Sequence, residues 1–85
     1  MSYFVYILKS CGYNRFYIGC TEDLEKRLLA HNSGGTKSTK SYRPWKLIYS
    51  ENFHEKDAAY KREWHLKHPA GYLEKLKIIK EGGFA

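Results

Sequence analysis

Five residues of this sequence have side chains of types that hydrolytic chemistry uses: Tyr6, Tyr17, Arg27, His31 and Glu63. The planar guanidinium offers a phosphate a fork of donors and neutralises charge on its non-bridging oxygens. A tyrosine hydroxyl or the imidazole could take the proton from an attacking water, if its pKa falls beside neighbouring positive charge. Together these side chains could hydrolyse a phosphodiester bond.

Each of these side chains also has an ordinary structural interpretation. The two tyrosines could be amphipathic strand residues with an apolar body and a wet hydroxyl. The arginine and the histidine could extend from the edge of an apolar stripe to water. Glu63 and Lys67 form an i,i+4 helix pair worth about 0.3–0.5 kcal/mol. From the residues alone, the ordinary interpretation stays open for all five.

The excess positive charge is confined to one segment. The chain has a net charge of +6 at pH 7, and there is no carboxylate between Lys26 and Ser50. Hydroxyls and rings, including Thr39, Tyr42 and Trp45, alternate with the cations there, as a phosphate-tracking surface requires. A solvated loop, an acidic protein partner or a membrane surface would fit the same charge pattern. The candidate nucleic-acid-binding residues, one of them on a later helix, are Lys26, Lys37, Lys40, Arg43, Lys46 and Lys67.

The elements that must position these residues begin with a hairpin. Residues 3–8 are aromatic and β-branched on both faces, which is typical of a strand buried on both sides. Residues 10–14 have turn chemistry, and residues 15–20 form a second strand. If the connecting loop holds an even number of residues, Tyr6 pairs directly with Tyr17 and both rings lie on one face.

A helix follows the hairpin. Thr21 can cap it, carboxylates in its first turn suit its dipole, and it runs to about Ala30. The stripe that should face the sheet carries a guanidinium and an imidazole, because it consists of Leu24, Arg27, Leu28 and His31.

The rest of the chain supplies a third strand and two helices. The strand is expected over residues 45–49, after a proline, and the helices over residues 55–68 and 72–80. The order β-β-α-β-α-α predicts an α+β fold with a three-stranded antiparallel sheet flanked by helices.

Length and composition limit the possibilities. A chain of 85 residues makes one domain, here 1–85 with a core of about 3–68, and its site should be a shallow cleft. Its longest apolar run, residues 3–8, is far shorter than the ~20 residues of a membrane span, so we expect a cytoplasmic protein. Cys11 and Cys20 are expected to be reduced thiols, and no zinc site is expected because the cysteines and histidines lack knuckle spacing.

The ordered set of motifs resembles the GIY-YIG nuclease family, in particular its small stand-alone bacterial branch, and is similar to the N-terminal nuclease domain of the excision-repair endonuclease. The matching residues, which span about 3–68, are Phe4-Val5-Tyr6, Tyr17-Ile18-Gly19, Asp23-Leu24, Arg27, His31 and Glu63. The resemblance implies a three-stranded antiparallel sheet flanked by helices. It also implies cleavage of phosphodiester bonds with a divalent metal.

The resemblance assigns a role to each candidate residue. Tyr6 and Tyr17 become the two motif tyrosines, and Arg27 becomes the residue that binds the scissile phosphate. His31 is the polar residue one turn later, and Glu63 is the metal-binding carboxylate. One carboxylate with several waters suits Mg²⁺, with Mn²⁺ as the alternative. Whether a tyrosine or the histidine is the general base stays open.

This sequence departs from the family pattern at two places. Phe4 and Val5 replace the glycine and isoleucine of the first motif, which a buried strand tolerates. Cys20 follows the motif glycine, where many repair-type relatives have a lysine thought to assist the tyrosine. The second departure leaves open how Tyr17 would be activated.

The resulting hypothesis is a metal-dependent endonuclease that cuts DNA with structure-directed or weakly sequence-specific binding, in repair or processing. We expect a monomer whose partner is nucleic acid, DNA in the first place, with a protein partner that supplies substrate specificity and no membrane contact. Two alternatives stay open: a nucleic-acid-binding module of the same fold with little or no turnover, and a protein-interaction adaptor.

Overall fold

The computed structural model describes residues 2–82 of the chain. Its elements are β1 (Tyr3–Ser10), β2 (Phe16–Thr21), α1 (Leu24–Ser33), the 3-10 turn η1 (Lys40–Tyr42), β3 (Trp45–Phe53), α2 (Lys56–Lys67), the 3-10 turn η2 (Pro69–Gly71) and α3 (Tyr72–Gly82). The α+β fold and the β-β-α-β-α-α order are therefore confirmed.

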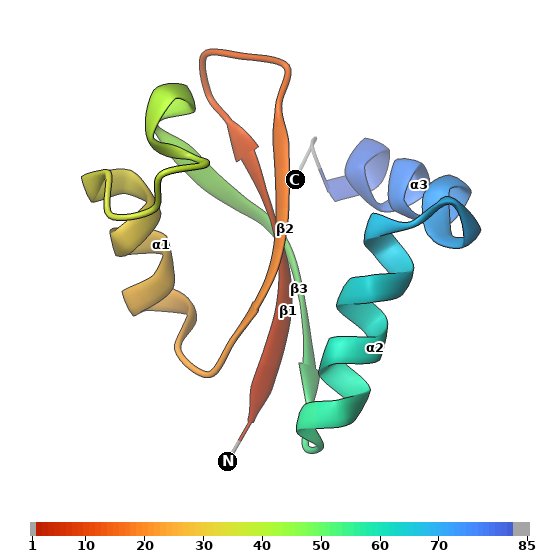
Figure 1. Cartoon of the computed structure of the whole chain (residues 1–85). Coiled ribbons are helices and arrows are strands. Elements are labelled where there is room, and N and C mark those ends of the chain that lie inside the picture. The colour runs from red at the N-terminus through yellow and green to blue at the C-terminus, as the bar shows by residue number, and fades with distance from the viewer. Residues whose placement is uncertain (1, 83–85) are drawn as a thin grey trace.

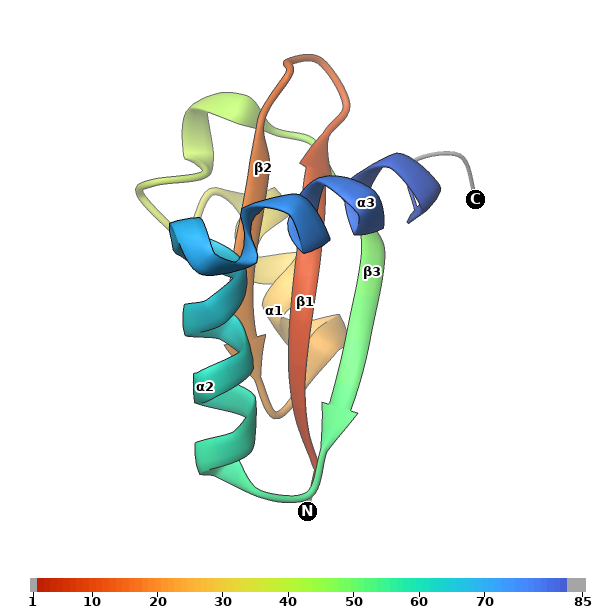
Figure 2. The same ribbon diagram turned by 90° about the vertical axis from the view of Figure 1, so that its right-hand side faces the viewer.

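The three strands form one antiparallel sheet in the order β2-β1-β3. Figure 1 shows α1 against one face of this sheet and α2 and α3 against the other. In Figure 2, α2 runs alongside the edge strand β2, while α3 crosses the end of the sheet. A residue on α1 and a residue on α2 can therefore meet only around the β2 edge.

The central strand β1 is buried on both faces because each face meets a different helix layer. Val5 and Ile7 pack with Leu66 of α2 in one cluster. Leu8 points to the opposite face, where it packs with Trp45 and the apolar residues of α1. The predicted strand buried on both sides is confirmed.

The hairpin register differs from the one expected. Tyr6 lies opposite Gly19, and Tyr17 lies opposite Leu8, so direct pairing of the two tyrosines is wrong. The loop between the strands is two residues longer than direct pairing requires, and this shifts the pairing by one full period. Both rings still share the face covered by α1, because a two-residue shift preserves the face. A Cβ on Gly19 would lie 2.5 Å from the Tyr6 hydroxyl oxygen, so only glycine leaves room for the phenol.

Helix α1 begins and ends later than predicted. Asp23, not Thr21, is the N-cap: its carboxylate accepts a hydrogen bond of 3.1 Å from the Lys26 backbone N–H. The Thr21 hydroxyl instead accepts from the Asp23 N–H at 3.1 Å and so shapes the turn before the helix. Gly34, with φ of 85°, ends the helix in the left-handed conformation that glycine adopts without strain.

Arg62 connects α2 to β3 and to α3 on the side of the sheet opposite α1. Arg62 of α2 donates to Glu51 of β3 at 2.7 Å and to Glu74 of α3 at 2.7 Å. The strand β3 reaches Phe53, beyond the predicted end, and this extension supplies Glu51. Among residues 2–82, no helix is long and apolar enough to cross a membrane.

Candidate active site

Three of the predicted residues meet in a hydrogen-bonded group between β1 and α1. The Tyr6 hydroxyl lies 3.1 Å from Nε2 of His31. Nε of Arg27 donates to the same hydroxyl oxygen at 3.3 Å. Tyr6 and His31 are buried, and Arg27 is half-buried. The helical stripe predicted to face the sheet therefore does bring the guanidinium and the imidazole to the phenol.

A buried threonine fixes the direction of this group. The Thr39 hydroxyl donates to the Thr36 carbonyl at 3.2 Å, so its oxygen is left to accept from Nδ1 of His31 at 2.9 Å. A neutral imidazole with its proton on Nδ1 has an acceptor at Nε2. Tyr6 must then donate its own proton to Nε2, while its oxygen accepts from Arg27. All the hydrogen bonds of the chain point the same way, from Arg27 through Tyr6 and His31 to Thr39.

The environment keeps both titratable members of this group neutral. Burial raises the pKa of Tyr6 to about 12, although the hydrogen bond from Arg27 acts in the opposite direction. Burial, and next the positive charge of Arg27, lower the pKa of His31 below its ordinary value. A neutral phenol that donates to a neutral imidazole is the arrangement that the hydrogen-bond directions require.

Tyr17 completes the wall of the site. Its ring centroid lies 4.7 Å from that of His31 and 6.2 Å from that of Tyr6. The hydrogen bond with Tyr6 raises the pKa of Arg27, and Tyr17 adds to this effect. The two tyrosines thus flank the guanidinium, as the shared face of the hairpin predicts.

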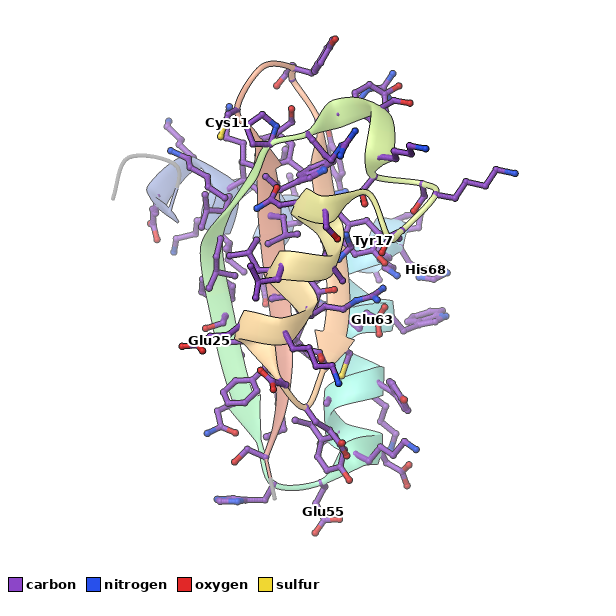
Figure 3. The ribbon with its side chains drawn as sticks, turned by 90° about the vertical axis from the view of Figure 1, so that its left-hand side faces the viewer. Cys11, Tyr17, Glu25, Glu55, Glu63 and His68 are labelled. Carbon is purple, nitrogen blue, oxygen red and sulfur yellow. The ribbon has the colours of Figure 1, made fainter. Side chains whose placement is uncertain are left out.

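Glu63 reaches this region from the opposite side of the sheet. Figure 3 shows it on α2, beyond the edge strand β2 and near Tyr17. Its carboxylate accepts a hydrogen bond of 2.6 Å from Nζ of Lys67, and this Nζ lies 5.9 Å from the centroid of the Tyr17 ring. Burial, and next the Glu63 charge, raise the pKa of the Cys20 thiol, the residue after the motif glycine. Lys67 is therefore the contact that links Glu63 to the aromatic wall.

The donor set near Glu63 limits how a metal could be held. Within residues 2–82, no three histidine, cysteine, aspartate or glutamate side chains gather as a metal cage would need. Glu63 offers one carboxylate, with a side chain 20% exposed and Lys67 as a counter-ion. Mg²⁺ often keeps several waters and binds through one or two carboxylates and substrate phosphates. The residues fit a hydrated divalent cation that arrives with a phosphate.

A shallow hollow lies beside Arg27. It has a volume of about 180 Å³ and is lined by Thr21, Asp23, Lys26, Arg27 and Ala30. The guanidinium thus connects the buried phenol on one side with an open, partly cationic surface on the other. This arrangement suits an anion that approaches from solvent.

The six predicted cations lie in three places. Lys46 lies opposite Lys9 in the sheet register, on the face opposite to that of its neighbour Trp45. Lys67 lies beside Glu63 on α2, and the other four predicted cations belong to α1 and the loop after it. The side chains of all six are exposed: Lys26, Lys37, Lys40, Arg43, Lys46 and Lys67.

Two residues of the basic segment have a role that the sequence did not indicate. Thr39 and Trp45 were expected to contact phosphate and bases, but both are buried, with only 4% of Trp45 exposed. Nε1 of Trp45 donates to the Thr39 carbonyl at 2.8 Å, and Thr39 orients His31. Trp45 is the first residue of β3, and its buried indole N–H needs a partner, but the sequence does not show which group supplies it.

Comparison with known proteins places this geometry in a family. The GIY-YIG catalytic domain matches residues 2–76. A UPF0213 protein of Lactococcus lactis subsp. cremoris is 48% identical over 80 residues, which are 93% of this chain and 81% of that protein. A UPF0213 protein of Staphylococcus saprophyticus is 43% identical over 81 residues, 94% of this chain and 96% of that protein.

A solved structure has the same fold. The solution NMR structure of a UPF0213 protein from Bacillus halodurans superposes with a TM-score of 0.58 at 31% sequence identity. The match covers 98% of this chain and 88% of that chain. With the sheet order, the tyrosine pair and the matched domain together, the chain belongs to the GIY-YIG family, in a group with the bacterial UPF0213 proteins.

Proposed function

We propose that this protein is a divalent-metal-dependent endonuclease that hydrolyses phosphodiester bonds in DNA. The observation that supports this most is the one-way chain of hydrogen bonds from Arg27 through Tyr6 to His31, with Arg27 at the open end. Such a chain couples the binding of an anion to the movement of a proton. The match to a catalytic domain over residues 2–76 supports the same reaction class.

Arg27 binds the scissile phosphate in this proposal. Its Nε is used by the Tyr6 hydroxyl, which leaves the terminal nitrogens of the fork for non-bridging oxygens. Burial is the larger cause of the lowered pKa of His31, and bound phosphate compensates the second cause, the positive charge of Arg27. The imidazole becomes a better proton acceptor only when substrate is in place.

The proton of the attacking water then moves along the chain. The water oxygen forms a bond to phosphorus and gives a proton to the Tyr6 oxygen, while Tyr6 passes its own proton to Nε2 of His31. The bond from phosphorus to the leaving oxygen breaks, and the leaving oxygen takes a proton from bulk water. His31 holds the abstracted proton as an imidazolium and returns it to solvent through Tyr6 once the products leave. Thr39 still accepts from Nδ1 in both states, so the ring need not move.

Glu63 is the residue that would hold the metal. When bound, a divalent cation supplies charge neutralisation at the phosphate and the leaving oxygen. Lys67, which neutralises Glu63 in this structure, also contributes a positive charge next to Tyr17. DNA follows the exposed cations of α1 and its loop, and we further propose that the protein acts as a cytoplasmic monomer, with specificity from a partner.

The ion pair favours a second candidate function. Because Lys67 occupies the one carboxylate at the site, the protein could be a nucleic-acid-binding module with little or no turnover. The two functions differ in what Glu63 does. A binding module needs no metal, whereas the nuclease loses cleavage when the carboxylate is lost.

The test is cleavage of an end-labelled panel of single strands, duplexes, flaps, nicked and branched DNA, and RNA, with Mg²⁺ or Mn²⁺. Wild type is compared with Glu63→Gln, which keeps size and removes charge. Products from wild type alone support the nuclease. Salt-sensitive binding without products from either protein supports the binding module. If neither the wild type nor Glu63→Gln binds any nucleic acid of the panel, the protein-interaction adaptor is the remaining hypothesis.

A further inference from the structure

The outer face of α2 carries a row of exposed rings next to the Glu63 position. Tyr60 is 50% exposed and Trp64 is 57% exposed, although large aromatics are normally covered in a folded chain. They are four residues apart, so they lie on one line of the helix, and His68 continues that line. Neither ring belongs to the hydrophobic clusters that hold the sheet and helices together.

Two rings of this row are held in place by contacts within the row. The Trp64 and His68 rings are stacked, with centroids 4.0 Å apart and planes 15° apart, and Nδ1 of His68 lies 2.6 Å from the Trp64 carbonyl. His68 therefore covers one face of the indole, and the large exposed area of Trp64 must come from the rest of the ring. A hollow of about 310 Å³ lies beside it, lined by Tyr60, Lys61 and Trp64.

The charges around the row are those of a nucleic-acid contact. Nζ of Lys56 lies 5.6 Å from the centroid of the Tyr60 ring, and Lys61 lines the hollow. Lys67 is paired with Glu63, so Lys56 and Lys61 are the ammonium groups that accompany the rings, and Asp57 is the one exposed carboxylate within α2. Rings with flanking cations form the usual surface for bases and their phosphates.

We propose that Trp64 and Tyr60 form a stacking platform for unpaired bases of a nucleic-acid strand, and that the substrate of the site is therefore single-stranded at or beside the cut. Bases inside a duplex stack on each other and offer no free face, whereas unpaired bases can stack on aromatic side chains. This inference rests on the proposed function, because it places the platform next to Glu63, which directly precedes Trp64 and belongs to the proposed active site. A strand held by Arg27 would pass the β2 edge with its bases toward α2.

Two tryptophans with opposite environments make the platform measurable. Trp45 is 4% exposed, so quenching of the intrinsic fluorescence by an oligonucleotide reports on Trp64. We would titrate wild type with oligo(dT) of ~12 nucleotides, the corresponding RNA and a blunt duplex, at one fixed salt concentration and with EDTA present. Quenching by the single strands and not by the duplex is the expected result, and the DNA and RNA arms show which sugar is preferred.

Affinity is then compared between variants by the anisotropy of a labelled strand. Trp64→Ala should weaken single-strand binding about tenfold, and Trp64→Phe should lose less. The matched control is Tyr72→Ala on α3, because Tyr72 is 52% exposed and has Lys75 over its ring at 5.5 Å. Equal affinities for Trp64→Ala and Tyr72→Ala, with unchanged circular dichroism, would refute the platform.

The platform and the nuclease can fail separately. If the wild type does not cleave any substrate but its single-strand binding depends on Trp64, the nuclease is rejected and the platform is kept. Cleavage that needs Glu63 but proceeds equally well in Trp64→Ala, with equal preference for duplex and single strand, would reject the platform and keep the nuclease.

Discussion

Replacement of Thr39 by valine tests the direction of the proton chain. Valine keeps the shape of threonine but removes the oxygen that accepts from Nδ1 of His31 at 2.9 Å. The imidazole is fully buried, so the orphaned N–H costs about 1–3 kcal/mol of folding free energy. For a domain of 85 residues, a loss of about 2 kcal/mol lowers Tm by roughly 8–16 °C.

The same substitution should disturb catalysis more than binding. Without the Thr39 acceptor, the proton of His31 can move to Nε2, where it can bond to the Tyr6 oxygen, and the ring can no longer accept the phenol proton. General acid–base groups contribute about 10²- to 10⁴-fold, so cleavage should fall by at least about 10²-fold while oligonucleotide affinity changes little.

The assays are thermal unfolding, cleavage rate and the nitrogen NMR shifts of the imidazole, which distinguish the two tautomers. Thr39→Ser is the matched control because it keeps the hydroxyl and should keep the tautomer and most of the rate. If Thr39→Val retains the Nδ1–H tautomer and cleaves at the wild-type rate, the inferred direction of the chain is incorrect.

Three further substitutions test other parts of the structure. Gly19→Ala should lower stability by about 1–3 kcal/mol and abolish cleavage, because its methyl group collides with the phenol from β1; unchanged chemical denaturation would contradict this. Arg62→Met should destabilise the protein at pH 7: burial acts to raise the pKa of Glu51, but the Arg62 hydrogen bonds, the Tyr49 hydrogen bond and the Arg62 charge together lower it; this stabilisation is present above the ordinary carboxyl pKa and is lost as pH falls through the lowered one, so the two unfolding curves should converge in acid. Lys67→Met should lower the Mg²⁺ concentration needed for half-maximal cleavage up to about fivefold, because an exposed ion pair is worth about 0.2–1 kcal/mol, and a higher requirement would show that Lys67 assists the metal at Glu63.

The parts of the fold that follow from local periodicity were predictable. The stripe on α1 that carries Arg27 and His31 repeats at helical spacing, and it faces the sheet as expected. The hairpin puts Tyr6 and Tyr17 on one face because any even shift in register preserves the face. These features depend on the spacing within single elements, which a sequence displays directly.

The parts that depend on long-range geometry were not predictable. The register of the hairpin depends on how the loop closes, and turn residues alone allow more than one loop length. Thr39 and Trp45 carry polar groups inside a basic loop, and nothing in their neighbours distinguishes a buried pair from a phosphate contact. Their role appears only when α1 and the start of β3 are placed against each other.

The site therefore has a rigid half and an exposed half, divided by the edge strand. Tyr6, His31 and Thr39 are buried and held in one hydrogen-bond direction, so this half is already organised before substrate arrives. Glu63 and Lys67 stand on α2 around the β2 edge and neutralise each other near solvent.

The high pKa of the Tyr6 phenol and the low pKa of the His31 imidazole keep the proton on Tyr6 in the resting protein. In the proposed reaction, a phosphate must engage both halves at once, because it compensates the charge of Arg27 on one side and would lie beside Glu63, the residue that would hold a cation, on the other. Hydrolysis then requires a backbone that reaches both sides of the edge, because free phosphate at Arg27 alone would compensate the charge there without engaging Glu63.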